Sequence, residues 1–119
     1  MIGVSVGDIG EAVLTVFENP QEYKSKLLGL AGDKLLVSEY IAILNKHLAP
    51  IKFIDSHITA QKFGSLGFPA AEELSVMFEF FQSGKMQRDL EFSKKLNKNV
   101  LTFEAWVVKN KTKLLASLW

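Results

Sequence analysis

The sequence predicts a helix-rich α/β fold, in which a small sheet of two or three partly parallel strands packs with five or six helices. Apolar residues recur at helical spacing over most of the chain, and short apolar runs bounded by turn residues separate these segments. At 119 residues, 48% apolar and 23% charged, the chain is long enough for one hydrophobic core and too short for two. We therefore expect residues 1–119 to form a single domain.

The first helix is expected to follow a short strand over residues 4–6. Asp8 suits the N-cap position, because its side chain can accept hydrogen bonds from the free amides of the first turn. Apolar residues then follow on one helical face, namely Ile9, Ala12, Val13, Val16 and Phe17. Asn19-Pro20 should end this helix, since the residue before a proline is disfavoured in the helical region.

A strand, a helix and a second strand are predicted next. Residues 26–31 and 51–54 are short apolar runs, and the residues of 37–48 place one apolar stripe along a helix. Strands joined by a helix of this length should lie parallel, with a right-handed crossover. Leu36 falls at the N-cap of this helix, although leucine has no side-chain acceptor.

The second half of the chain is predicted to be helical. Thr59 and Thr102 suit N-cap positions, and Pro69 suits a first helical turn. The expected helices cover residues 59–64 or 59–67, 69–82, 88–96, and a last segment from residue 103 onward.

The charges are distributed unevenly. Residues 1–93 carry 8 Lys and Arg against 12 Asp and Glu, a net charge of −4, and residues 94–119 carry 6 Lys against one Glu, a net charge of +5. A basic end can attract nucleic acid, but this one has no arginine and no exposed stacking aromatics, so we do not expect nucleic-acid binding. Without an apolar run of about 18 residues or a signal-peptide pattern, we expect no membrane contact and a cytoplasmic or nuclear location.

No catalytic, cofactor-binding or metal-binding residues are assigned. Gly3, Gly7 and Gly10 lack the G-x-G-x-x-G spacing and the strand that delivers a dinucleotide-binding loop, so we interpret them as a turn into a helix. Residues 55–57 are Asp, Ser and His, but triad side chains must converge from separate positions. The chain has no cysteine, and no His, Asp or Glu group has metal-ligand spacing. We therefore expect no enzymatic activity from this chain alone.

Aromatic residues crowd the second half of the chain. They fit either a core lined on two sides or a face that covers another domain or a ligand. Phe68, Phe80 and Phe81 are our candidates for a partner-binding or substrate-binding face.

The segment GFPAAEELSVMFEFF at residues 67–81 resembles the NmrA-like family, whose members are atypical relatives of the short-chain dehydrogenases/reductases. Residues 6–10, 39–44, 88–97 and 102–106 also resemble family segments, so the similarity spans almost the whole chain. The sequence differs from the family pattern at Ala70, where glycine is usual, and at Leu36, where threonine is expected.

The resemblance implies that this chain is the C-terminal lobe of a Rossmann-type protein. In that family an N-terminal Rossmann half binds NADP(H), so the resemblance places the cofactor site upstream of Met1 and no cofactor on this chain. Short-chain dehydrogenases pair a tyrosine with a lysine four residues later, whereas Tyr23 and Tyr40 are followed at that spacing by Leu27 and Leu44.

Three functional hypotheses follow. In the first, the chain is the non-catalytic lobe of an NADP(H)-binding redox sensor, which contacts the Rossmann half and a regulatory protein partner. In the second, it is the substrate-binding lobe of an active NAD(P)H-dependent reductase. In the third, it is a stand-alone interaction module that self-associates.

Overall fold

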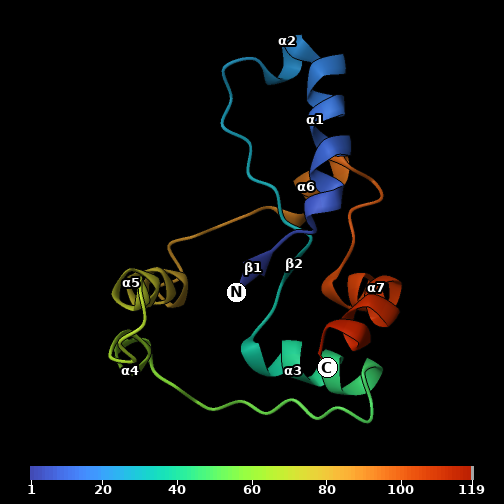
Figure 1. Cartoon of the computed structure of the whole chain (residues 1–119). Helices are drawn as coiled ribbons and strands as arrows, with labels where there is room; N and C mark the ends of the chain where they lie inside the picture. Colours follow the sequence, from blue (N-terminus) through green and yellow to red (C-terminus); the bar gives the residue numbers. More distant parts are fainter. Residues whose placement is uncertain (119) are drawn as a thin grey trace.

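The computed structural model describes residues 1–118, and within them it contains seven α-helices, one 3-10 helix and one two-stranded sheet (Figure 1). In chain order the elements are β1 (Ile2–Gly3), η1 (Val6–Asp8), α1 (Ile9–Glu18), α2 (Pro20–Tyr23), β2 (Asp33–Lys34), α3 (Val37–His47), α4 (Ala60–Gly64), α5 (Ala71–Gln82), α6 (Leu90–Leu96) and α7 (Phe103–Ser117).

The predicted helix-rich composition is confirmed, with one helix more than expected, the single turn α2. Local capping explains where several helices begin. Thr59 accepts a hydrogen bond from the Lys62 amide and Thr102 accepts one from the Ala105 amide, both at 3.2 Å. At Leu36, which has no acceptor of its own, the Glu39 carboxylate instead accepts the Leu36 amide at 2.7 Å.

The predicted parallel sheet is wrong. β1 and β2 are antiparallel, with Ile2 opposite Lys34 and Gly3 opposite Asp33. Residues 4–6, 26–31 and 51–54 form no strands. A strand is defined by a neighbour that pairs with its backbone, and within residues 1–118 these runs have none.

Two other local predictions are wrong. The Asp8 side chain does not cap α1; its Oδ2 accepts the Leu101 amide at 2.8 Å. Pro69 lies before the first turn of α5, because the chain turns at Ala70 with a left-handed φ of 69° and the helix begins at Ala71.

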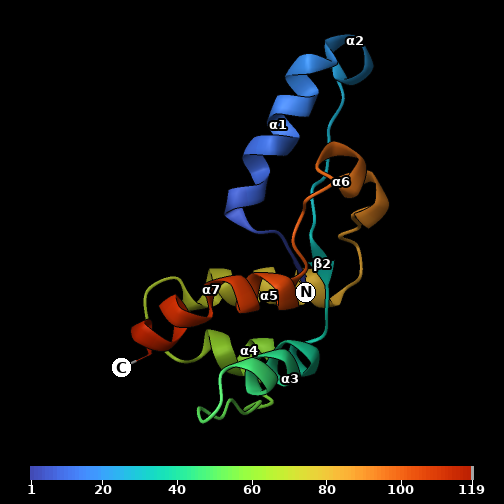
Figure 2. The same ribbon diagram turned by 90° about the vertical axis from the view of Figure 1, so that its right-hand side faces the viewer.

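Hydrophobic contacts form two groups outside α4 and α5. In the first, Ala12, Tyr23 and Leu96 join α1, α2 and α6, which lie together in Figure 2. In the second, α3 packs against α7, and Leu48 and Val107 are almost fully buried. β1 and β2 lie between these two groups (Figure 1).

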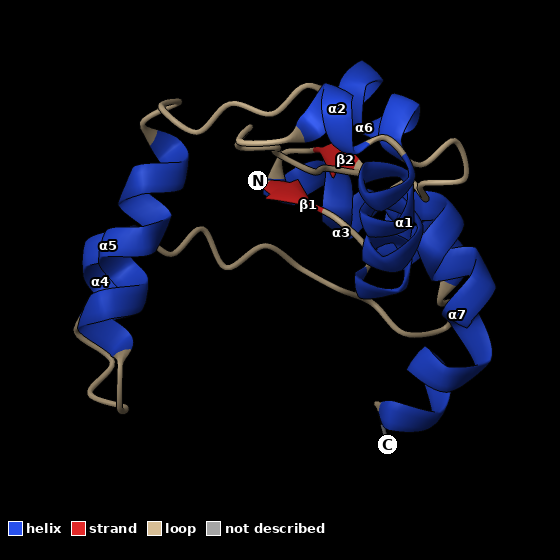
Figure 3. Ribbon diagram, turned by 90° about the horizontal axis from the view of Figure 1, so that it is seen from above, coloured by secondary structure: helices blue, strands red, loops and turns tan. Residues whose placement is uncertain are grey.

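The α4–α5 hairpin, residues 60–82, packs mainly on itself. The Phe63 ring contacts Phe68 and Phe78 edge-to-face, with centroids 5.4 and 5.0 Å apart. In Figures 1 and 3 the hairpin stands apart from the other helices, and extended segments connect it to α3 and α6. The hairpin therefore gains little stabilisation from the rest of the described chain.

The molecule is extended for its length. Its radius of gyration is 16.9 Å, whereas a compact domain of this size has about 13.5 Å. Its accessible surface is 8693 Å², against about 6,450 Å² for a compact monomer of this mass. The chain thus exposes roughly 2,200 Å² more surface than a self-contained domain would.

Candidate functional site

Hydrogen bonds to two aspartates fix the start of α7 against the N-terminal segment. Asp33 Oδ2 accepts the Phe103 amide at 3.0 Å, and Asp8 Oδ2 accepts the Leu101 amide at 2.8 Å. Asn97, which is almost fully buried, donates to the Asp8 carbonyl at 3.0 Å. These contacts position residues 101–106 opposite residues 3–7.

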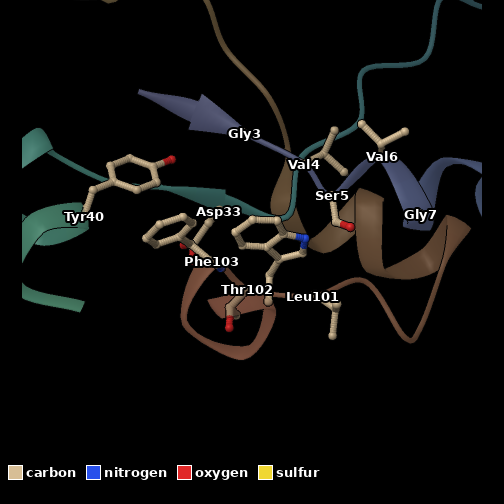
Figure 4. Close-up of a pocket in the computed structure, with 11 residues that line it drawn as sticks. Gly3, Val4, Ser5, Val6, Gly7, Asp33, Tyr40, Leu101, Thr102 and Phe103 are labelled. Carbon is tan, nitrogen blue, oxygen red and sulfur yellow. Dashed lines mark hydrogen bonds between the residues drawn. The ribbon is translucent and has the colours of Figure 1, made fainter. Parts of the chain in front are cut away.

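A cavity of about 350 Å³ lies at this junction (Figure 4). In Figure 4, Tyr40 enters from α3, Phe103 from the start of α7, and Val4 and Ser5 from the segment after β1. The lining residues are Gly3, Val4, Ser5, Val6, Gly7, Asp33, Tyr40, Leu101, Thr102, Phe103 and Trp106. We call this space the aromatic cavity.

Three aromatic rings form one wall of the aromatic cavity. Tyr40 and Phe103 meet edge-to-face with centroids 4.5 Å apart, and Phe103 stacks on Trp106 at 6.2 Å with an interplanar angle of 18°. Rings held in this way offer a flat apolar surface on which a planar ligand can stack.

Polar groups are also available in the aromatic cavity. Within residues 1–118, Ser5 Oγ, Tyr40 Oη and Trp106 Nε1 make no hydrogen bond to the protein. Burial, with a smaller effect from the Asp33 carboxylate, raises the pKa of Tyr40 above its ordinary value, so its hydroxyl is a neutral donor. The cavity therefore suits a planar, mostly apolar ligand that carries an acceptor oxygen.

Residues 51–56 form a second candidate site, whose available binding groups are backbone amides and carbonyls. The Asn45 side-chain amide donates to the Phe53 carbonyl at 2.9 Å and accepts the Phe53 amide at 2.7 Å, in the way a neighbouring strand would. The flanking residues Lys52 and Ile54 have no backbone hydrogen bond within residues 1–118.

Exposure along residues 51–56 alternates as in a strand. Ile51, Phe53 and Asp55 are half-buried, whereas Lys52, Ile54 and Ser56 are exposed, Ile54 at 77%. We call residues 52–56 the free edge, because alternate residues there leave backbone donors and acceptors available to another strand.

The predicted face of Phe68, Phe80 and Phe81 lies on the α4–α5 hairpin. Phe68 is in the turn before α5 and packs on Phe63, while Phe80 and Phe81 lie near the end of α5. The structure thus brings all three onto one hairpin, at opposite ends of one helix. Phe68 and Phe80 remain 40% and 48% exposed.

The glycines at positions 3, 7 and 10 and the Asp-Ser-His run at 55–57 both have ordinary structural roles in the fold. Gly3, Gly7 and Gly10 all have ordinary φ values, and a Cβ at Gly10 would meet nothing within 4 Å, so the backbone there does not require glycine as a phosphate-binding loop does. Asp55 Oδ1 accepts the His57 amide at 2.8 Å in a turn, and the His57 ring is exposed.

Sequence reasoning missed the aromatic cavity. The sequence indicates that Tyr40, Phe103 and Trp106 lie in helical segments, but their convergence depends on Asp33, which appears in the sequence only as part of a turn. In the described part of the chain, no three His, Asp or Glu residues are grouped so as to hold a metal ion. None of the described helices is both long and apolar enough to cross a bilayer.

The sequence pattern of the NmrA-like family matches residues 2–107. The match covers every described element from β1 through α6 and the first five residues of α7, including Tyr40, Phe103 and Trp106 of the aromatic cavity. The chain belongs to the NmrA-like family.

Proposed function

We propose that this chain is the non-catalytic, partner-binding lobe of an NmrA-like protein that binds NADP(H) and senses redox state. The observation that carries the proposal is the surface excess of roughly 2,200 Å² over a compact monomer, which is enough for more than one standard protein interface. A Rossmann-type half that binds NADP(H) is the first partner, and a regulatory protein is the second.

The free edge supports a partner that contributes a strand. Lys52 and Ile54 leave unsatisfied backbone groups in an otherwise strand-like segment, and adding a strand would satisfy them. The NmrA-like family is linked to NAD(P) binding, and a sheet of the Rossmann type offers such strands at its edges.

The test is to mix the labelled chain with the recombinant NAD(P)-binding half of an NmrA-like protein and to follow amide exchange. We expect slowed exchange at Lys52 and Ile54, with little change at Phe53, whose amide is already bonded to Asn45. Unchanged exchange at all three positions would contradict the proposal.

Cofactor binding is measured separately, by titrating NADPH into the chain alone and following amide shifts. We expect no saturable shifts, because on this proposal the cofactor site belongs to the other half. Saturable shifts at micromolar NADPH would place a cofactor site on this chain and refute the division of roles.

The aromatic cavity favours a second candidate function, the substrate-binding lobe of an NAD(P)H-dependent reductase. Its stacked rings and its free donors at Ser5, Tyr40 and Trp106 suit a planar carbonyl compound such as a quinone. With Trp119→Phe as background, Trp106 is the only tryptophan. A naphthoquinone should then quench its fluorescence saturably, and Tyr40→Leu should weaken that binding. Linear, non-saturable quenching would remove this candidate.

A further inference from the structure

The outer face of α5 is acidic and apolar and has no partner within the described chain. Five exposed residues fall within about 120° of the helix circumference at 100° per residue; they are Glu72, Glu73, Val76, Glu79 and Phe80. None of the three glutamates forms an ion pair within residues 1–118. The inner face of α5 is occupied by α4.

The outer face of α7 has the opposite charge. Six of its exposed residues fall within about 140° of the helix circumference at 100° per residue; they are Ala105, Val108, Lys109, Thr112, Lys113 and Ala116. Lys111 lies outside this face, about 160° around the helix from Lys109 and Lys113. Lys109 and Lys113 likewise form no ion pair within the described chain.

The two faces cannot meet within one chain. Figures 1 and 3 both place the α4–α5 hairpin and α7 on opposite sides of the molecule. In a pair of copies related by a two-fold axis, a contact between the hairpin of one copy and α7 of the other is made twice.

We propose that the chain forms a two-fold symmetric dimer in which the outer face of α5 in each copy docks on the outer face of α7 in the other. Val76 and Phe80 pack against Val108 and Ala116, and Glu72, Glu73 and Glu79 face Lys109 and Lys113. A standard interface needs about 800 Å² from each partner, and the surface excess of roughly 2,200 Å² per chain exceeds that. The dimer does not depend on the proposed cofactor-binding half.

Charge reversal tests the pairing. Two variants are made, the triple Glu72→Lys/Glu73→Lys/Glu79→Lys and the double Lys109→Glu/Lys113→Glu. In sedimentation velocity the wild-type chain should be dimeric, and each variant alone should dimerise at least about tenfold more weakly because like charges then meet. In an equal mixture both contacts of the hetero-dimer are attractive, one between the reversed charges and one between the original charges, so hetero-dimers should form more tightly than either homo-dimer.

Cross-linking tests the geometry. The chain has no cysteine, so Val76→Cys and Val108→Cys each introduce a unique thiol on an exposed position. A short bismaleimide should link the mixed single variants into a hetero-dimer more efficiently than it links either variant to itself. The matched control replaces Val108→Cys with Leu27→Cys, a fully exposed position outside the interface, and should give only background linkage.

A chain that stays monomeric at several hundred micromolar would overturn the proposal. So would a dimer that the charge reversals do not weaken, or cross-linking that joins Val76→Cys to Leu27→Cys as efficiently as to Val108→Cys. Far-UV circular dichroism of each variant establishes that it is folded. Binding to an NAD(P)-binding half is a separate measurement at the free edge, so the two proposals can fail independently.

Discussion

Ala70 has a backbone conformation that is unfavourable for a residue with a side chain. Its φ of 69° lies in the left-handed region, which costs a residue with a Cβ about 1–2 kcal/mol relative to glycine. The turn that it makes sets the direction in which α5 leaves Phe68 and Pro69. The resemblance to the NmrA-like family leads us to expect glycine at this position, and the left-handed turn supplies a physical reason for it.

Ala70→Gly is expected to stabilise the chain. The substitution removes the left-handed strain and gives back part of the gain through the larger entropy of the unfolded chain, so we expect a net increase of about 0.5–1 kcal/mol in the free energy of unfolding. Urea denaturation measures the change. Ala71→Gly is the control, since Ala71 is buried in ordinary helical conformation and its replacement should destabilise by about 1 kcal/mol. A loss of stability in both variants would be inconsistent with strain at Ala70.

Asn45→Ala should release the segment that carries the free edge. It removes both hydrogen bonds to Phe53, each worth about 1 kcal/mol. Amide exchange at Phe53 should then accelerate to the rate of Lys52 and Ile54. Asn99→Ala, which removes an exposed contact to Glu11, should leave exchange at Phe53 unchanged. If Phe53 stays protected without Asn45, the side chain is not what holds this segment.

Residues with local roles could be predicted from the sequence, and residues with distant partners could not. Thr59 and Thr102 act on amides three residues away, so their capping follows from the sequence alone. The Asp8 carboxylate had the same local option, but it bonds to Leu101, 93 residues away, and nothing near Asp8 signals that partner. The aromatic cavity escaped prediction for the same reason.

At the scale of elements, strands were the least predictable feature. Residues 26–31 and 51–54 have the composition of strands, and residues 51–56 even show the alternating exposure, yet neither has a neighbouring strand in the described chain. Helices satisfy their own backbone groups, so their positions followed from periodicity, whereas strands depend on a partner that periodicity does not reveal.

The contact between α3 and α7 should weaken in acid. Glu104 Oε1 lies 2.7 Å from both Lys46 Nζ and His47 Nε2, and these contacts, Lys46 first, lower the pKa of Glu104 below its ordinary value of 4.5. A carboxylate with a lowered folded-state pKa stabilises fully above its ordinary value, and this contribution is lost as the pH falls through the lowered value.

Glu104→Gln should therefore lower the melting temperature at pH 7 and have progressively less effect as the pH falls below 4.5. Thermal unfolding followed by circular dichroism at pH 7, 4.5 and 3 measures this. Glu73→Gln, whose side chain has no ion pair within residues 1–118, is the matched control and should show no such convergence. An equal difference from wild type at all three pH values would exclude the ion pairs as the cause.

Gly32 and Gly10 differ in whether the structure leaves room for a side chain at their positions. A Cβ at Gly32 would collide with the carbonyl oxygen of Leu101, which is backbone and cannot move aside, so Gly32→Ala should cost about 1–3 kcal/mol. Gly10 lies in α1 with open space around it, so Gly10→Ala should stabilise by up to about 1 kcal/mol. Chemical denaturation of the two variants should give opposite signs, and equal signs would show that the packing of residue 32 on residue 101 is not tight.

At the scale of the whole molecule, the extended shape and the dimer proposal lead to a dependence on concentration. Association stabilises the folded state by mass action, so the melting temperature should rise when the chain concentration is raised from about 5 to about 200 µM. The charge-reversed variant of α5 should show a smaller rise. A melting temperature that does not change with concentration would identify the folded form as a monomer.

We expect the contacts between the beginning and the end of the sequence to set the order of folding as well. Ala31 bonds to Ser93, Asp33 to Phe103, and Asp8 to Asn97 and Leu101, across 62, 70, 89 and 93 residues. During synthesis, the first third of the chain therefore has to wait until residues 93–103 have left the ribosome. Such long-range closure is slow compared with helix formation. The α4–α5 hairpin is made before that point and packs mainly on itself, so it should be the first part of the nascent chain to fold.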